Sequence, residues 1–278
     1  MKPFAERRVT RIRDGRAEVV DDCVVTEEPL EIRAADEVLA ITMRTPGADR
    51  ELAIGFLWAE GVISSRDDVG SVYHCGRVGT PEYGNAINVA PGAGISLDID
   101  RVSATRRGTL TTAACGVCGR TSIKDVVERC VRVPAGSPLS PAMLARAMER
   151  LRERQPTFER TGGLHAAAIL DDTGEVLAAY EDIGRHNAVD KAVGALVIAG
   201  RIGAVGKGAP ALLAVSGRAS FEVVQKAAAA RLRAIASVSA ASSLAVDLAS
   251  ALGITLAGFV RGGGMTVYSH PEGIAPSV

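Results

Sequence analysis

Short runs that mix polar and β-branched residues dominate the first part of the chain. These runs predict strands at residues 17–25, 30–33, 37–43, 71–75 and 86–89, separated by segments that contain Pro, Gly, Glu or Asp. Between them, residues 51–60 place Leu52 and Phe56 on one apolar side of a helix, which Gly61 ends. Residues 1–16 are polar and arginine-rich, and we expect them to form a flexible N-terminus.

The pattern changes after the segment P-A-G-S-P-L-S-P at residues 134–141, which is typical of a linker. Helices are predicted from Ser140–Pro141 onward and at residues 188–199, 221–233 and 244–252. Strands are predicted at residues 165–170, 176–180, 212–215, 235–238, 254–259 and 265–268. A repeated strand–loop–helix unit is typical of an α/β domain with a largely parallel sheet. We therefore predict a smaller α+β domain at residues 17–135 and a larger α/β domain at residues 136–278.

Three loops of the larger domain follow predicted strands and precede predicted helices. They read E-D-I-G-R-H-N at residues 181–187, S-G-R-A-S at 216–220 and A-A-S-S at 240–243. The carboxyl ends of parallel strands form the binding crevice of such domains, and helix N-termini favour anions. Arg185 and Arg218 lie in these loops, and the segment R-G-G-G adds Arg261. We predict that the loops converge on a phosphate-rich ligand.

His186 lies in the first of these loops and not on an apolar helical face. Because this loop is expected at a switch point of the sheet, His186 is a candidate for ligand binding. The plain alternative is a histidine that bonds only within its own loop.

Composition narrows the functional classes. The 278 residues are 47% hydrophobic, and 32 Lys and Arg balance 32 Asp and Glu, so the net charge is zero. A zero balance speaks against general nucleic-acid binding. No run approaches the roughly 20 apolar residues that span a bilayer, and residues 1–10 lack the apolar core of a signal peptide. We expect a cytoplasmic protein with reduced thiols and no membrane association.

Two of the five cysteines, Cys115 and Cys118, form a C-x-x-C motif within T-T-A-A-C-G-V-C-G-R. Reduced C-x-x-C motifs serve metal binding or catalysis more often than structural stapling. Three chemistries fit the spacing: half a zinc site completed by His74 and Cys75, a thioredoxin-like dithiol, or a persulfide carrier. The spacing does not choose among them. Positive charge that favours a reactive thiolate is available from Arg106, Arg107 and Arg120.

Several motifs occur together in a specific order. After T-T-A-A-C-G-V-C-G-R come T-G-G-L-H, E-D-I-G-R-H-N-A-V-D-K, S-G-R-A-S-F-E-V-V-Q-K, A-S-S-L-A-V-D-L-A and G-F-V-R-G-G-G-M-T-V-Y. From about residue 17 to the C-terminus the chain resembles the formate dehydrogenase accessory sulfurtransferase family, FdhD. The resemblance implies a three-layer, cytidine-deaminase-like larger domain beside the smaller α+β domain, and a homodimer. Deaminase activity is not expected, because the H-x-E and P-C-x-x-C signature of those enzymes is absent.

The resemblance also implies a function. Members of the family accept sulfur from a cysteine desulfurase and pass it to the molybdenum or tungsten bis-guanine-dinucleotide cofactor of formate dehydrogenase, which a guanine nucleotide such as GDP is expected to mimic. By position, Cys115 matches the persulfide carrier, and Cys118 matches a second cysteine that acts as relay or disulfide partner. No resident metal is expected. The family's cofactor-binding segment matches Phe259, Val260, Arg261, Gly262, Gly263 and Gly264.

Two alternatives stay open at the level of sequence. One is a non-catalytic chaperone that binds the molybdenum cofactor and uses the C-x-x-C motif only structurally. The other is a zinc-stabilised protein. The dehydrogenase that is served, and the choice between molybdenum and tungsten, are not readable from the residues.

Overall fold

The computed structural model of the chain describes residues 2–80, 83–103 and 130–275. Cys115 and Cys118 lie outside the described residues. Within the described residues, no helix has both the length and the apolar character required to cross a membrane.

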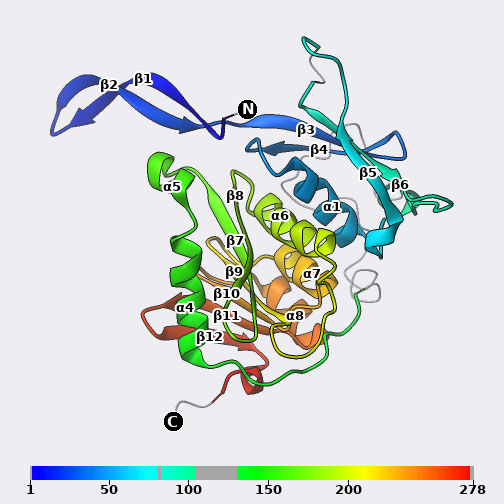
Figure 1. The fold of residues 1–278 in the computed structure, drawn as a ribbon. Coiled ribbons are helices and arrows are strands. Elements are labelled where there is room, and N and C mark those ends of the chain that lie inside the picture. Colours follow the sequence, from blue (N-terminus) through cyan, green and yellow to red (C-terminus); the bar gives the residue numbers. More distant parts are fainter. Residues whose placement is uncertain (1, 81–82, 104–129, 276–278) are drawn as a thin grey trace.

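A six-stranded sheet organises the C-terminal half (Figure 1). Its spatial order is β12-β11-β10-β9-β7-β8. The strands β9, β10 and β11 are parallel, whereas β7 is antiparallel to both β8 and β9, and β12 is antiparallel to β11. The strand β8 therefore points in the same direction as β9, β10 and β11. The bounds are β7 His165–Asp171, β8 Val176–Asp182, β9 Pro210–Val215, β10 Ala234–Ser237, β11 Thr255–Arg261 and β12 Gly264–Ser269.

This topology brings the carboxyl ends of four strands to one edge of the sheet, here called the carboxyl edge: the ends of β8, β9, β10 and β11, together with the start of β7. The loops that follow these strands are those predicted to converge. The convergence is confirmed, because β7 runs antiparallel between β8 and β9 and so leaves those two in the same direction.

Helices cover both faces of the sheet, which gives three layers (Figure 1). One face packs against α4 (Pro141–Arg152), and the short helix α5 (Pro156–Thr161) follows it. The opposite face packs against α6 (Arg185–Ile198), α7 (Phe221–Ala229) and α8 (Ser243–Leu252). The predicted α/β class is confirmed.

The helix predicted at residues 221–233 is shorter than expected. It ends at Ala229, and Arg231 adopts a left-handed conformation with φ of 57°. The N–H of Leu232 returns to the carbonyl of Ala227 at 2.9 Å, which turns the chain toward β10. Apolar residues at helical spacing continue beyond Ala229, but the backbone leaves the helical conformation there, so the sequence pattern predicted a longer helix.

The N-terminal half forms a four-stranded sheet in the order β4-β3-β6-β5. Alternating burial along β3 places one face of this sheet in the core. The helix α1 (Asp49–Glu60) packs between this sheet and α6, and a short helix α2 (Asp100–Ser103) lies further along the chain. The strands are β3 Glu28–Ala34, β4 Glu37–Arg44, β5 Val69–His74 and β6 Ala86–Pro91.

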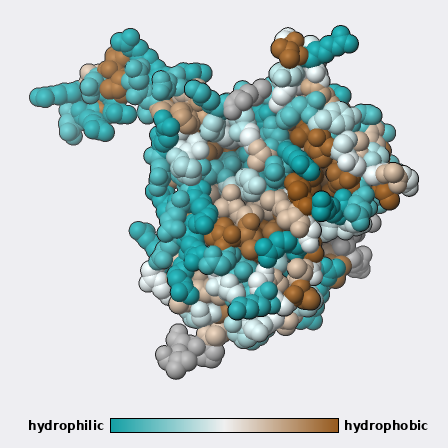
Figure 2. All heavy atoms as spheres, in the orientation of Figure 1, coloured by the Kyte–Doolittle hydropathy of each residue, from teal (hydrophilic) through white to brown (hydrophobic). Residues whose placement is uncertain are grey.

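The prediction of a flexible N-terminus at residues 1–16 was wrong for most of that segment. The strands β1 (Phe4–Arg13) and β2 (Arg16–Val25) form an antiparallel hairpin that projects from the body (Figure 1). Asp14 and Gly15, with φ of 49° and 74°, form the two-residue turn that such hairpins favour. Arginines of β1 face acidic residues of β2, as in the pair Arg8 and Asp21. The hairpin is largely hydrophilic, and its charge hid the strand pattern (Figure 2).

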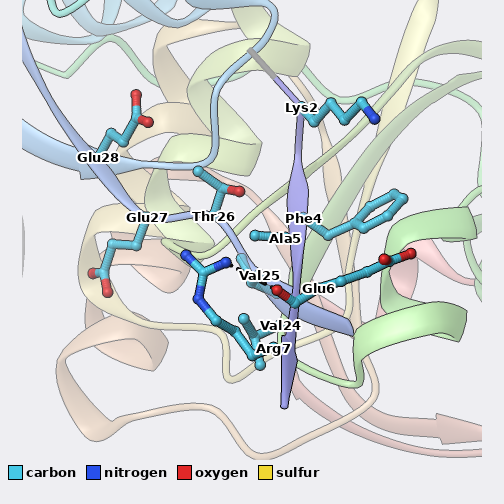
Figure 3. Close-up of a pocket in the computed structure, with 10 residues that line it drawn as sticks. All are labelled: Lys2, Phe4, Ala5, Glu6, Arg7, Val24, Val25, Thr26, Glu27 and Glu28. Atoms are coloured by element: carbon cyan, nitrogen blue, oxygen red, sulfur yellow. Dashed lines mark hydrogen bonds between the residues drawn. The ribbon is translucent and has the colours of Figure 1, made fainter. Parts of the chain in front are cut away.

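The hairpin meets the body near α5. The guanidinium of Arg160 lies 4.1 Å from the ring centroid of Phe4, and Val25 packs against Gly163. A hollow of about 750 Å³ lies at this base (Figure 3). The described residues that line it belong to β1, β2 and their flanks, and none of the predicted site residues that the structure describes is among them.

The helices α1 and α6 cross in backbone contact. A Cβ atom at Gly55 would lie 1.9 Å from the carbonyl oxygen of Asp190, and one at Gly194 would lie 1.9 Å from that of Glu51. Buried side chains from both sides of residue 136 belong to one core cluster around this crossing. The division into two domains at that residue stays a prediction.

We expect Gly194→Ala to destabilise the protein by about 3 kcal/mol, at the upper end of the cost of overpacking. Alanine is the better helix former, so a loss of stability would be due to the clash with the Glu51 carbonyl. The measurement is the free energy of unfolding in urea. Gly264→Ala is the control, because its Cβ would come no closer than 3.5 Å to another atom. Equal stability of the two variants would contradict the close crossing.

Candidate functional site at the carboxyl edge

A fully buried carboxylate lies at the end of β8. Asp182 accepts hydrogen bonds from the backbone N–H groups of Thr45 at 3.2 Å and Gly184 at 2.8 Å. It also accepts from the side-chain amide of Asn187 at 2.9 Å and pairs with the ammonium of Lys191 at 2.7 Å. A buried charge requires such partners, because its water shell is lost. Asp182 thereby joins the β8–α6 loop to the segment between β4 and α1.

Asn187 strengthens the same junction. Its amide nitrogen donates to the carbonyl of Met43 at 2.8 Å, and its amide oxygen accepts from the hydroxyl of Thr42 at 3.1 Å. The first turn of α6 is thus held by residues more than a hundred positions earlier in the chain. This fixes the position of Arg185 and His186, the two residues of that turn that were predicted as part of the site.

A second buried ion pair supports α6 one turn further on. The ammonium of Lys226 lies 2.8 Å and 2.9 Å from the two carboxylate oxygens of Asp190. Burial raises the pKa of Asp190 to about 6, and the charge of Lys226 opposes that rise.

His186 does not bond only within its own loop. Its Nδ1 lies 2.9 Å from a carboxylate oxygen of Glu222, and its Nε2 lies 3.0 Å from the hydroxyl of Ser220. Arg185 Nε donates to the same Nε2 at 3.2 Å. Two of these partners belong to the N-terminus of α7. Glu222 was missed from the sequence, although it follows the S-G-R-A-S loop by only two positions.

A cavity of about 910 Å³ opens at the same edge, on the side of α4. Residues of the sheet, His165, Ser216, Arg261 and Gly262, form part of its wall. The other part comes from the α4–α5 region, where Leu151 is buried and Gln155 is 4% exposed. A concave, mostly apolar wall with a few polar groups is typical of small-ligand sites.

An aromatic ring and a guanidinium face each other in this cavity wall. The guanidinium of Arg152 lies 4.9 Å from the ring centroid of Phe158, and both residues line the cavity. Flat groups of this kind offer stacking surfaces for a planar ligand. Neither residue was predicted, since nothing in the local sequence marks them.

Only part of the predicted cofactor-binding segment lines the cavity. Val260, Arg261 and Gly262 line the cavity, whereas Phe259 is 52% exposed with a φ of 52° and is not part of the lining. Gly262 and Gly263, with φ of 54° and 85°, form the tight turn from β11 to β12 that Gly264 completes. A left-handed phenylalanine is strained, and such strain is concentrated at functional sites.

The predicted arginines lie on the same edge, in different loops. Arg261 belongs to the cavity, Arg185 is half-buried beside His165, and Arg218 is exposed in the β9–α7 loop. Gly217 permits this arrangement, since a Cβ there would lie 3.1 Å from Nδ1 of His165 and 3.8 Å from Cδ of Arg185. The structure therefore brings Arg185 close to His165 and places Arg261 in the cavity wall that contains His165.

His165 responds to this grouping. Burial lowers the pKa of His165, and the positive charge of Arg185 lowers it further, against the opposing effect of Asp182. The structure places His165 in the cavity wall.

A zinc site is not tested by the structure. Within the described residues no three His, Cys, Asp or Glu side chains lie in a position to hold a metal ion. Cys115 and Cys118 lie outside those residues, so the zinc alternative stays a prediction. Of the cysteines that the structure describes, Cys23 and Cys75 are free thiols.

Comparisons with known proteins match nearly the whole chain. A family model described as the FdhD/NarQ family matches residues 25–275. "Sulfur carrier protein FdhD" of Anaeromyxobacter dehalogenans is 58% identical over 270 residues, covering 96% of this chain and 92% of that protein. The protein of the same name from Streptomyces coelicolor is 46% identical, covering 97% and 95%.

The fold also matches a solved structure. A protein from Desulfotalea psychrophila, described as a formate dehydrogenase accessory protein, superposes with a TM-score of 0.75 at 23% identity. The match covers 99% of this chain and 100% of that one. At that identity the likeness supports the fold.

We expect Arg185→Gln to raise the pKa of His165 toward its ordinary value of 6.5, because a nearby positive charge is removed. The titration of the imidazole Cε1 proton by NMR measures it, and Arg218→Gln is the charge-matched control. In the wild type the neutral form of His165 is favoured in the folded state. The stability that this histidine contributes is therefore present above pH 6.5 and is lost as the pH falls below it. An unchanged pKa in Arg185→Gln would contradict the grouping.

Proposed function

This chain belongs to the FdhD/NarQ family, and from that premise we propose that it is a sulfur carrier protein that supports formate dehydrogenase. The names of its relatives support the sulfur-carrier role, and the described neighbour from Desulfotalea psychrophila is consistent with the link to formate dehydrogenase. The C-x-x-C motif at Cys115 and Cys118 supplies the thiol chemistry that the role requires.

In the proposed reaction, the Cys115 thiolate attacks the terminal sulfur of a cysteine desulfurase persulfide. The sulfur–sulfur bond of the desulfurase breaks, its cysteine leaves as a thiolate, and a persulfide forms on Cys115. The terminal sulfur then passes to the metal of the bis-guanine-dinucleotide cofactor, which is the substrate. Cys118 serves as relay or disulfide partner. Formation of the persulfide requires no external oxidant, because the sulfur arrives already at the sulfane level. A terminal sulfido ligand is two electrons more reduced, so Cys118, as disulfide partner, attacks the inner sulfur of the Cys115 persulfide and releases the outer sulfur at the sulfide level to the metal. The disulfide between Cys115 and Cys118 that remains is reduced by a cellular thiol before the next cycle.

The carboxyl edge is proposed to bind that substrate, and its cavity is the observation that carries the proposal. Its volume of about 910 Å³ suits one nucleotide half of the cofactor. The flat pair of Arg152 and Phe158 would stack the base, and Arg261 would bind the diphosphate. Arg185 and Arg218 extend the positive surface along the edge, next to the N-termini of α6 and α7.

We further propose a homodimer located in the cytoplasm, with a cytidine-deaminase-like larger domain. The cytidine-deaminase-like arrangement is supported by the strand order β12-β11-β10-β9-β7-β8 with helices on both faces. Its cavity wall contains His165, but the deaminase signature is absent from the sequence.

A non-catalytic cofactor chaperone remains the second candidate, because cavity residues that the structure describes, such as Arg152, Phe158 and Arg261, could supply the binding groups by themselves. Binding alone would not require either thiol. Attachment of sulfur to Cys115 distinguishes the two functions, because the sulfur carrier requires it and the chaperone does not.

We expect Cys115→Ala to abolish formate dehydrogenase activity when it replaces the wild type in cells, while its thermal unfolding is unchanged. Incubation of the wild type with a cysteine desulfurase and cysteine should add the mass of one sulfur atom to the peptide containing Cys115. Cys23→Ala is the control, since that thiol lies in the N-terminal hairpin. Full activity of Cys115→Ala would favour the chaperone.

We expect Arg261→Ala to weaken GDP binding by about tenfold, because a charge-assisted hydrogen bond to a phosphate contributes about 1.5 kcal/mol or more. Isothermal titration calorimetry measures the affinity. Arg16→Ala, at the exposed turn of the hairpin, removes the same charge far from the carboxyl edge and is the control. Equal affinities of the two variants would place the diphosphate elsewhere.

A further inference from the structure

The serine before α7 uses its hydroxyl differently from comparable serines in this chain. Ser140 and Ser242 precede α4 and α8, and each side chain accepts a hydrogen bond from a backbone N–H, at 3.1 Å and 3.3 Å. Ser220 occupies the same position before α7 and makes no such capping bond. Its hydroxyl instead lies 3.0 Å from Nε2 of His186. A capping bond normally stabilises the start of a helix. Because Ser220 does not make one, its hydroxyl is available to another partner.

The imidazole of His186 connects that hydroxyl to a carboxylate. Nδ1 lies 2.9 Å from Glu222, and the side chains of His186 and Glu222 are 8% and 14% exposed. Ser220 itself is partly exposed. A partly exposed hydroxyl thus contacts a buried imidazole, which in turn contacts a shielded carboxylate. This is the geometry of an activated serine nucleophile.

The partners also determine the tautomer. A carboxylate can only accept, so the neutral imidazole carries its proton on Nδ1, toward Glu222. Nε2 is then the acceptor, and it receives the hydroxyl of Ser220 and the Nε–H of Arg185 at 3.2 Å. This is the tautomer in which a histidine can remove a proton from serine. Arg185 shares the lone pair, and an anionic ligand that draws this arginine away would leave Nε2 to Ser220 alone.

The surroundings of Ser220 suit the reaction of such a nucleophile. The first turn of α7 starts at Phe221, directly after the serine, and the N–H groups of a first turn point toward its N-terminal end. They are positioned for a developing oxyanion, since the serine hydroxyl does not cap them. The exposed Arg218 lies two positions before the serine, and the half-buried Arg185 contacts the same imidazole nitrogen as the serine hydroxyl, which favours a substrate that carries negative charge.

We propose that Ser220, His186 and Glu222 form an acyl-transfer site that acts on esters or thioesters bearing an anionic group. The hydroxyl oxygen of Ser220 forms a bond to the acyl carbon while its proton moves to Nε2 of His186. The bond to the alcohol or thiol breaks, and that leaving group takes the proton from His186. Water then releases the acid by the reverse transfers, so that hydrolysis is balanced without a cofactor. The site contains neither Cys115 nor Cys118 and operates independently of sulfur transfer.

The test is active-site labelling of the purified full chain with a fluorophosphonate. The serine oxygen attacks phosphorus, and fluoride leaves. Mass spectrometry of the digested protein should locate the label on Ser220, and Ser220→Ala should lose it. His186→Gln should slow labelling by about 100-fold or more, the usual contribution of a general base. Glu222→Gln preserves the shape of the side chain, so a rate reduced by about tenfold or more in a folded protein would report the loss of its charge.

Ser242→Ala is the matched control, because Ser242 also precedes a helix but caps it. Its labelling at Ser220 should equal that of the wild type. Hydrolysis of 4-nitrophenyl hydrogen succinate faster than of 4-nitrophenyl acetate, with the difference lost in Arg218→Gln, would support the anionic substrate. Absence of label on Ser220, equal labelling of Ser242, or unchanged labelling in both the His186 and Glu222 variants would overturn the assignment.

Discussion

Asp182 can be buried as an ion only because four donors surround it, three from residues 184–191 and one from the backbone of Thr45. Thr45 and Lys191 belong to opposite halves of the chain. Loss of the Lys191 ammonium would leave a charge in the core without its compensation. The carboxylate therefore fixes how the segment after β4 meets the first turn of α6, and with it the direction of Arg185 and His186. The geometry of the carboxyl edge follows from this one buried charge.

The crossing of α1 and α6 also joins the N-terminal half to the larger sheet. Gly55 and Gly194 allow the two backbones to touch, and this contact brings the N-terminal sheet against the helical layer of the larger sheet. A continuous core results, in which the described part of the N-terminal half supports the site, while the described residues of the cavity wall come from the C-terminal half. The ligand surface itself is left to loops and to the α4–α5 region. This is the usual division of labour between a rigid scaffold and the loops that it positions.

Much of the fold was readable in advance because strands and helices differ in their apolar period. The strands of the larger sheet and the loops after them were predicted, and their convergence followed from the rule for parallel strands. Charge hid the strand at residues 4–13, although Asp14 and Gly15 marked its turn. The end of α7 was misplaced because Arg231 adopts a left-handed conformation that arginine seldom takes.

The residues alone determined the order of the motifs, the family that they indicate and the loops that carry the basic side chains. Only the tertiary structure showed that His186 meets Ser220 and Glu222, that Gln155 and the pair of Arg152 and Phe158 face a cavity, and that Asp182 binds Thr45. The reason is physical. Periodicity reports which side chains share a face with their neighbours in the chain, over a few residues. Contacts between residues 34 or 137 positions apart depend on how whole elements pack, and no local pattern records that packing.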